Sequence, residues 1–326
     1  MSNQVKTVLG TMAIGTPSLD NKQALVLLNT YKERGYSEID SAIMYGQGNT
    51  EVALGELAAA ESFTIATKAN PWFIAKGNSP IHQNKGLAKD KVHEQLNISL
   101  ENLKTQSVDL FYLHAPDHIT PIEETLSAVN ELYTQGKFKR FGISNYASWQ
   151  VAQICEICKA NNWVMPSVYQ GMYNALTRDV EAELFPCLRH YKISFYAYNP
   201  LAGGILTGKY KFEDNPKSGR FNGKTMWGKA YRKRFWTKEF FDGVESVKAK
   251  AESHNLNLLQ ASIRWLYHHS SLSTEFGDAV ILGVSSIEHL NDNLTASEGG
   301  PLPEDLIVLF DAFATSLASK FPKYFR

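Results

Sequence analysis

Short runs of β-branched and aromatic residues alternate with amphipathic stretches along the chain, and this alternation restricts the fold more than any other feature. Each run is followed by a segment with the apolar spacing of a helix. Strands that alternate with helices form parallel sheets, and eight such units most simply close into a barrel. The sequence therefore predicts an α/β protein with a (β/α)8 TIM barrel. The predicted strands cover residues 7–15, 37–42, 63–69, 108–116, 138–145, 166–174, 193–201 and 279–286.

The connecting segments favour this barrel over an open, doubly wound sheet. An open sheet usually carries a glycine-rich fingerprint after its first strand, but residues 15–20 read GTPSLD. No composition break or Gly/Ser linker divides the chain, so we expect one domain over residues 1–326. Residues 201–224 form a long irregular stretch after the seventh strand. The whole segment 201–238 is too long for an ordinary connection, and we expect it to act as a lid or clamp. Helices are predicted near 287–296 and 303–319, at the end of the chain.

Bulk composition argues against several classes of function. Lys and Arg number 33, as do Asp and Glu, so the formal net charge is zero and no basic stripe offers a nucleic-acid surface. No apolar run reaches membrane-spanning length, and the first ten residues lack a signal-peptide core. Cys155 and Cys158 lie in a helical pattern, without a second pair for zinc. We therefore expect a cytoplasmic protein with no metal, no nucleic-acid partner and no membrane.

Four residues with compatible chemistry fall at, or just past, the ends of predicted strands: Asp40, Tyr45, Lys68 and His114. Barrel enzymes assemble their active sites from the ends of several strands. Tyrosine is a weak acid at neutral pH, with a usual pKa of about 10. A lysine cation held by a carboxylate would lower that pKa, and a histidine could aim a carbonyl at the hydroxyl. Packing or capping is the simpler explanation for each residue alone, so the argument rests on their joint occurrence.

Several motifs run in order through nearly the whole chain: DSAIMYG at 40–46, ATK at 66–68, LHAPD at 113–117, GISN at 142–145, YQ at 169–170 and YNPLAGG at 198–204. Together they resemble the motifs of the aldo-keto reductase superfamily. Segments at 231–236 (YRKRFW) and 324–326 (YFR) resemble one branch of it, the aflatoxin-aldehyde reductases. The resemblance implies a barrel that binds NADPH without a Rossmann domain and reduces aldehydes, dicarbonyls or ketones by direct hydride transfer.

The same resemblance implies a role for each of the four residues. Tyr45 would be the general acid that protonates the developing alkoxide. Lys68, paired with Asp40, would lower the pKa of Tyr45, and His114 would orient the carbonyl through a hydrogen bond. A proton donor and a cation directed at growing negative charge stabilise the transition state more than the ground state, which agrees with these roles independently.

The nicotinamide end of the cofactor is expected at the ends of the fifth, sixth and seventh strands. Ser144, Asn145 and Gln170 carry hydroxyl and amide groups that would hydrogen-bond the carboxamide, as the family pattern implies. Tyr198 would stack on the nicotinamide ring, and a core aromatic is the alternative interpretation.

The segment after the seventh strand would wrap the pyrophosphate of NADPH. Asn199 and Leu201 begin it, and Gly203 would allow close approach of the backbone. Lys209 and Arg220 are the expected phosphate ligands. A solvated loop charge is the alternative interpretation for each of these two side chains.

The adenosine end is expected after the eighth strand, beside Gly283. Ser285 and Ser286 open a helix there, and the free N–H groups of a helix N-terminus attract anions such as the 2′-phosphate. An ordinary serine N-cap is the alternative. His289 and Asn293 complete the predicted site. The branch usually has Gln in place of His289, and a histidine would make cofactor affinity pH-dependent.

The substrate pocket is expected to be walled by Met44, Trp72 and Trp227. Arg326 would clamp a substrate carboxylate, and in the branch this would favour short carboxyl-bearing aldehydes such as succinic semialdehyde, alongside dicarbonyls and quinones. A frayed terminal residue is the alternative for Arg326. The branch resemblance also suggests a homodimer.

Two other functions fit parts of the sequence. A class I aldolase would use Lys68 to form a Schiff base, which needs an uncharged lysine, whereas the adjacent Asp40 would keep it charged. A channel-associated β-subunit of the same superfamily would keep the cofactor site and use it for sensing. Trapping with borohydride separates the first alternative from a reductase, and co-purification with membrane partners separates the second.

Overall fold

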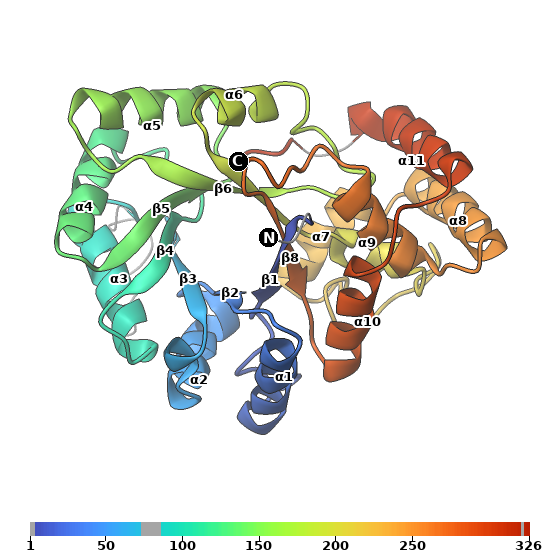
Figure 1. The fold of residues 1–326 in the computed structure, drawn as a ribbon, viewed down its shortest axis with the longest axis horizontal. Coiled ribbons are helices and arrows are strands. Elements are labelled where there is room, and N and C mark those ends of the chain that lie inside the picture. Colours follow the sequence, from blue (N-terminus) through green and yellow to red (C-terminus); the bar gives the residue numbers. More distant parts are fainter. Residues whose placement is uncertain (1–3, 73–85, 321–322) are drawn as a thin grey trace.

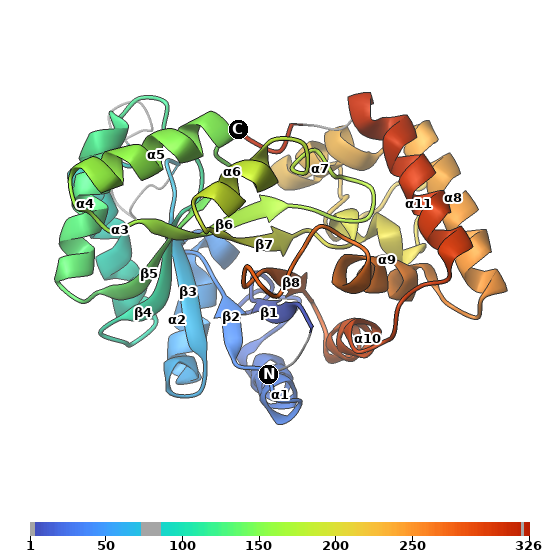
Figure 2. The ribbon, with the colours of Figure 1, turned by 45° about the horizontal axis from the view of Figure 1, so that its top comes forward.

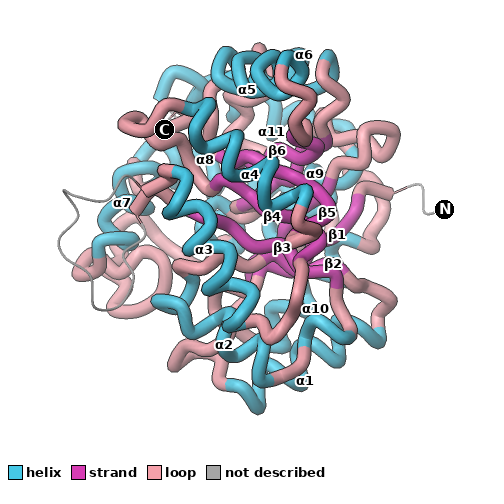
Figure 3. Tube along the Cα trace, turned by 90° about the vertical axis from the view of Figure 1, so that its left-hand side faces the viewer, coloured by secondary structure: helices cyan, strands magenta, loops and turns pink. Residues whose placement is uncertain are grey.

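The computed structural model describes residues 4–72, 86–320 and 323–326 and confirms the predicted barrel. In this part of the chain, parallel strands close into a ring in sequence order, because β8 pairs with β1. The strands lie inside a layer of helices (Figure 1 and Figure 3). They are β1 (Lys6–Gly10), β2 (Glu38–Asp40), β3 (Thr64–Ala69), β4 (Val108–Leu113), β5 (Phe138–Ser144), β6 (Pro166–Met172), β7 (Ser194–Tyr198) and β8 (Ala279–Gly283).

Most helices follow the strands around the ring, and α8 and α11 pack side by side beyond it (Figure 2). None of the helices in the described residues combines the length and the apolar character that crossing a bilayer requires. The α-helices are α1 (Asn21–Glu33), α2 (Asn49–Glu56), α3 (Lys89–Asn102), α4 (Ile122–Thr134), α5 (Ser148–Ala160), α6 (Leu184–His190), α7 (Met226–Phe235), α8 (Lys238–Ser253), α9 (Leu258–His268), α10 (Ile287–Ser297) and α11 (Glu304–Leu317). Shorter 3₁₀ turns are η1 (Tyr45–Gly48), η2 (Ala59–Glu61), η3 (Ala202–Thr207) and η4 (Ala318–Lys320).

Successive strand residues point alternately into the barrel and toward the helices. Val8 and Leu110 pack inside the ring, whereas their neighbours Leu9 and Phe111 pack into the larger core that contacts the helices. Both faces of the parallel sheet are therefore buried, which explains why the strand sequences read as nearly continuous apolar runs.

The first strand is shorter than predicted, because the chain turns at the rim. The sequence pattern extends over residues 7–15, but β1 ends at Gly10. The N–H of Ile14 donates to the carbonyl of Thr11 over 2.8 Å, and Gly15 follows with φ +73°. The apolar residues past the strand end thus pack in a turn. An alternating apolar pattern does not distinguish such a turn from a continued strand.

The segment 201–238 contains η3, within the stretch 201–224 that was predicted to be irregular, and α7, which follows that stretch. Thr225 caps α7 by accepting the N–H of Gly228 at 2.9 Å. Phe235 of this helix is buried in the core. The basic side chains of the helix point to solvent or lie over aromatic rings, as Arg232 does over Trp236. A lid or clamp at this place stays a prediction.

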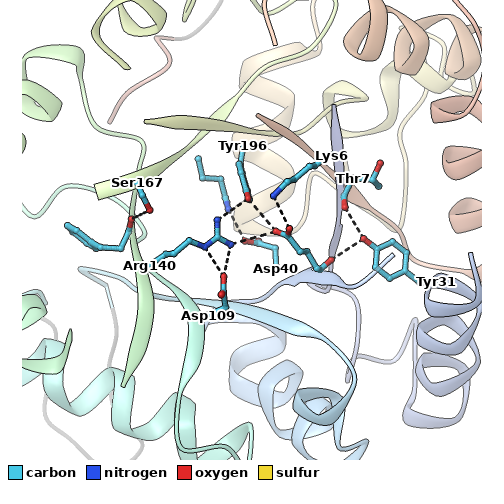
Figure 4. A network of polar contacts seen from close by, with 11 residues as sticks. Lys6, Thr7, Tyr31, Asp40, Asp109, Arg140, Ser167 and Tyr196 are labelled. Atoms are coloured by element: carbon cyan, nitrogen blue, oxygen red, sulfur yellow. Dashed lines mark hydrogen bonds and ion pairs between the residues drawn. The ribbon is translucent and has the colours of Figure 1, made fainter. Parts of the chain in front are cut away.

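The floor of the barrel, at the N-terminal strand ends, is closed by an ion-pair network (Figure 4). Arg140 donates from Nε to Asp109 at 2.8 Å and from Nη1 to the hydroxyl of Tyr196 at 3.2 Å. That hydroxyl donates to Glu38 at 3.3 Å, and Lys6 reaches the same carboxylate at 3.3 Å. The opposite rim, at the C-terminal ends of the strands, is the end at which the strand-terminal side chains lie beside the loops.

Candidate active site

Lys68 and Asp40 form a buried ion pair at the rim. Parallel pairing of β2 and β3 aligns Asp40 with Ala66, two residues before Lys68. Lys68 is fully buried, and its Nζ lies 2.6 Å from Oδ1 of Asp40 and also donates to the carbonyl of Ser41. Oδ2 of Asp40 accepts a second hydrogen bond from Gln170. Asp40 favours the ammonium form of Lys68, which opposes Schiff-base formation, whereas burial favours the neutral amine that the aldolase alternative needs.

Tyr45 and His114 complete the predicted set of four residues. Tyr45 is the first residue of η1, and its ring centroid lies 5.2 Å from Nζ of Lys68. Its ring also contacts His114 edge to face, with centroids 6.0 Å apart and an interplanar angle of 80°. The structure therefore brings an ammonium, its carboxylate, a phenol and an imidazole to one place.

The predicted lowering of the Tyr45 pKa is wrong for this structure. Burial raises the pKa of Tyr45 well above its usual value, and the negative charge of Asp40 adds to the effect. Asp40 lies 2.6 Å from Nζ of Lys68, so its negative charge offsets part of the effect of the ammonium on the phenol, and burial outweighs the part that remains. Burial also lowers the pKa of Lys68, while Asp40 opposes that change. Tyr45 is thus held as a neutral, proton-carrying phenol.

His114 is neutral for a related reason. Burial, followed by the charges of Lys68 and Arg326, lowers the pKa of His114 well below its usual value. Its Nδ1 is buried and has no hydrogen-bond partner among the described residues. A neutral imidazole can donate one hydrogen bond without carrying a charge, which suits the orientation of a carbonyl oxygen.

Asn145 connects the ends of three strands and the end of the chain. It has φ +66°, a conformation that Asn tolerates better than most residues. Its Nδ2 donates to the carbonyl of His114 at 2.8 Å and to Oγ of Ser144 at 2.9 Å. Its Oδ1 accepts from the hydroxyl of Tyr198 at 2.8 Å, and its carbonyl accepts the N–H of Arg326 at 3.0 Å. Three of the predicted nicotinamide residues, Ser144, Asn145 and Tyr198, therefore form one connected group, whereas the side chain of Gln170 bonds Asp40.

The start of the 201–238 segment is a tight turn. Oδ1 of Asn199 accepts the N–H of Gly203 at 2.7 Å, and the carbonyl of Leu201 accepts the N–H of Gly204 at 2.7 Å. Gly203 has φ +72°, and a Cβ there would lie 2.7 Å from the ring of Tyr231. Glycine is needed at this position for both reasons.

Arg220 and Gly283 approach each other across the rim. Nη2 of Arg220 lies 4.0 Å from the position that a Cβ would take on Gly283. The hydroxyl of Tyr231 accepts from Nη1 of Arg220 at 3.1 Å. Lys209 lines a separate pocket of about 340 Å³ with Tyr210 and residues 214–216. Arg220 thus lies beside the loop after β8, and Lys209 lies beside the turn at Gly204, with Cε 3.9 Å from the position that a Cβ would take there.

The residues after β8 lie at the N-terminus of α10. Ser286 is its N-cap and accepts the N–H of His289 at 3.2 Å, so the capping alternative holds for this hydroxyl. Oγ of Ser285 lies 3.2 Å from Nδ1 of His289. Asn293, one turn further on, is buried, and its Oδ1 has no partner in the described part of the chain.

The predicted substrate residues are only partly described. Met44 directly precedes Tyr45 and is half-buried. Trp72 is half-exposed, and the guanidinium carbon of Arg326 lies 5.7 Å from its ring centroid. Trp227 belongs to α7, but its side chain lies outside what the structure describes.

Three side chains have contacts in or near the site for which the sequence predicted no role. Tyr231 packs against Gly203 and bonds Arg220, yet its basic neighbours drew attention to charge instead. Tyr112 lies under Lys68, with Nζ 5.3 Å from its ring centroid, and the alignment of two strand ends was the available signal. Tyr324 lies in the segment YFR that resembles the branch, but no role was expected for it, because its contacts lie far away in sequence.

Comparisons with known proteins agree with this geometry. The family model described as the aldo/keto reductase family matches residues 6–314. Aflatoxin B1 aldehyde reductase member 2 of Mus musculus is 49% identical over 98% of this chain and 87% of its own length. Aflatoxin B1 aldehyde reductase member 4 and aldo-keto reductase family 7 member A3 of Homo sapiens are each 47% identical over 98% of this chain and 96% and 97% of their lengths. The chain therefore belongs to the aldo/keto reductase family of oxidoreductases.

Proposed function

We propose that this chain reduces aldehydes, dicarbonyls or ketones to alcohols, with NADPH as the hydride source and Tyr45 as the proton donor. Its family reduces aldehydes and ketones with nicotinamide cofactors. The observation that carries the proposal is the position of the Tyr45 ring, 5.2 Å from the Lys68 ammonium and edge to face with His114.

The bound nicotinamide supplies a hydride to the carbonyl carbon. The chain's own residues manage the charge that then develops on the oxygen. Neutral His114 donates a hydrogen bond to that oxygen and orients it, and Tyr45 delivers its proton there. Lys68, fixed by Asp40, lies beside the phenol and stabilises the oxygen charge as the proton leaves Tyr45. Because the pKa of Tyr45 is raised, the proton stays on the phenol until the substrate oxygen becomes basic.

The residues present fit a dinucleotide. Nδ2 of Asn199 and Oδ1 of Asn293 are buried without partners in the described residues, the first in the segment expected at the pyrophosphate and the second at the expected adenosine end. Both are polar atoms that burial leaves costly unless a ligand pairs with them. Ser144 and Gln170 add a hydroxyl and an amide, and Tyr198 adds a ring. We propose that Ser144, Gln170 and Tyr198, together with Asn145, form the nicotinamide site.

The preference for NADPH over NADH rests on charge at the loop after β8. Arg220 lies beside Gly283, and the N-terminus of α10 follows with Ser285 and Ser286. A guanidinium and free helix N–H groups together favour a phosphate monoester. We propose that the 2′-phosphate binds here, with His289 at its side.

The substrate class follows from Arg326 and Trp72. The guanidinium of Arg326 lies over the Trp72 ring, and its charge lowers the pKa of His114, so it is within electrostatic reach of the catalytic group. We propose that Arg326 pairs with a carboxylate of the substrate, while Met44 and the tryptophans contact its apolar part. The relatives named as aldehyde reductases support an aldehyde as the reacting group.

The replacement Tyr45→Phe tests the proposal. We expect turnover to fall by about 10²–10⁴-fold, the usual loss when a general acid is removed, while NADPH binding is kept. Tyr133→Phe is a matched control, since Tyr133 is exposed and packs on Phe138 at the other end of the barrel. Full activity in Tyr45→Phe would remove Tyr45 from the mechanism.

A further inference from the structure

The end of the chain is attached to the barrel by a buried tyrosine. Only 4% of Tyr324 is exposed. Its hydroxyl donates to the carboxylate of Glu183 and accepts the N–H of Ser148 at 3.0 Å. Its own N–H donates to Oδ2 of Asp179 at 3.3 Å. Three polar contacts thus fix one residue of the tail to the segments that carry α5 and α6.

One of these contacts completes the start of α5. Its N-cap, Ala147, donates its own N–H to Gln150 at 2.9 Å but has no side chain that could accept a free N–H group. The Tyr324 hydroxyl accepts the N–H of Ser148, the first residue of this helix, and so satisfies one of its free donors. The same hydroxyl donates to Glu183, the N-cap residue of α6, which makes no capping bond of its own. Burial raises the pKa of Tyr324 to about 12, so the phenol remains a neutral donor at working pH.

Two residues beyond Tyr324, the tail reaches the active site. The N–H of Arg326 donates to the carbonyl of Asn145 at 3.0 Å, and Asn145 itself holds His114 and Tyr198. Tyr324 and the Asn145 carbonyl are therefore two attachment points on either side of Phe325. Between them they fix the direction in which the Arg326 side chain leaves the backbone.

We propose that Tyr324 is a positioning residue for substrate selection, which holds the tail so that the guanidinium of Arg326 faces the mouth of the barrel. The inference rests on the proposed function, since it assigns Arg326 to a substrate carboxylate. A flexible arginine loses conformational freedom each time it pairs with a ligand. A tail that is already anchored reduces that cost, and the gain applies only to substrates that use the guanidinium.

The test compares Tyr324→Phe with Arg326→Ala on two aldehydes, succinic semialdehyde and butanal, which differ in a terminal carboxylate. We expect Tyr324→Phe to raise KM for succinic semialdehyde about tenfold and to change KM for butanal and both kcat values less than twofold, because the phenol lies outside the catalytic group. Arg326→Ala should show the same selectivity with a larger effect. Glu183→Gln keeps an acceptor for the phenol, so its KM for succinic semialdehyde should lie between those of wild type and Tyr324→Phe. Tyr133→Phe is the control.

A second readout reports the tail without any substrate. Carboxypeptidase B removes an arginine from the end of a polypeptide, so its rate on a polypeptide of residues 1–326 measures how often Arg326 leaves the barrel. We expect release to be at least fivefold faster in Tyr324→Phe than in wild type or Tyr133→Phe. The role of Tyr324 would be overturned if Tyr324→Phe left the rate of arginine release unchanged. It would also be overturned if Tyr324→Phe changed KM equally for both aldehydes while Arg326→Ala affected only succinic semialdehyde. Faster release in Tyr324→Phe, with no selectivity in Arg326→Ala, would instead overturn the clamp in the proposed function.

Discussion

The side-chain amide of Gln170 donates a hydrogen bond to Oδ2 of Asp40 over 2.8 Å. β6 and β2 lie on opposite sides of the ring, so this bond crosses the barrel interior. Since Lys68 occupies Oδ1, both carboxylate oxygens are held by protein donors. Gln170, expected from the sequence to bind nicotinamide, therefore also fixes the counter-charge of the lysine. The cofactor site and the ion pair share one side chain.

Asp40→Asn should leave a buried ammonium without its counter-charge. We expect the free energy of unfolding to fall by about 3–5 kcal/mol, the usual cost of breaking a buried pair, and turnover to fall with it. The double variant Asp40→Asn/Lys68→Met should recover most of that stability without recovering turnover. Urea unfolding at pH 7 and steady-state kinetics measure the two effects. Equal stability of wild type and Asp40→Asn would show that the pair is not desolvated as described.

His114 should make the fold sensitive to acid. Its pKa is lowered in the folded protein, so below about pH 6.5 the unfolded chain binds a proton that the folded chain does not. The stability present at neutral pH is therefore lost as pH falls, by about 1.4 kcal/mol for each pH unit in that range. His114→Gln should lose less stability than wild type between pH 7 and pH 5.5. Urea unfolding at both values checks this, with exposed His190→Gln as the control; identical slopes in wild type and His114→Gln would contradict it.

Gly243 should resist replacement, although it lies within α8. Alanine normally stabilises a helix interior by about 0.5–1 kcal/mol relative to glycine. Here a Cβ would lie 1.8 Å from Cε2 of Phe313 on α11, so the two helices would be pushed apart. We expect Gly243→Ala to lower stability by about 1–3 kcal/mol in thermal or urea unfolding. Ser246→Ala, on the exposed face of the same helix, should change little; a more stable Gly243→Ala would refute the close packing.

Local sequence signals were sufficient for the barrel and for the ion pair. Strands and helices alternate with clear periods, and Asp40 and Lys68 end adjacent strands, so their meeting follows from parallel pairing. The helix α7 was missed because the glycine- and lysine-rich stretch before it hides its start, which depends on the Thr225 cap.

Properties that depend on the whole environment were not predictable. The raised pKa of Tyr45 comes from burial together with Asp40, whereas the sequence showed only the neighbouring lysine. Tyr324 contacts Ser148 across 176 positions, and no periodic pattern reports such a contact. The bond from Gln170 to Asp40 spans 130 positions for the same reason.

The network at the barrel floor has a consequence for the ancestry and dissection of such a chain. A cut between β4 and β5 would leave Asp109 and Glu38 in one fragment and Arg140 and Tyr196 in the other. Glu38 would keep its contact with Lys6, but Asp109 would lose Arg140, which pairs with it in the intact ring. The two halves therefore carry complementary groups at the barrel floor. The bonds from Arg140 to Asp109 and from Tyr196 to Glu38 form only when both halves are present, so they favour the closed ring.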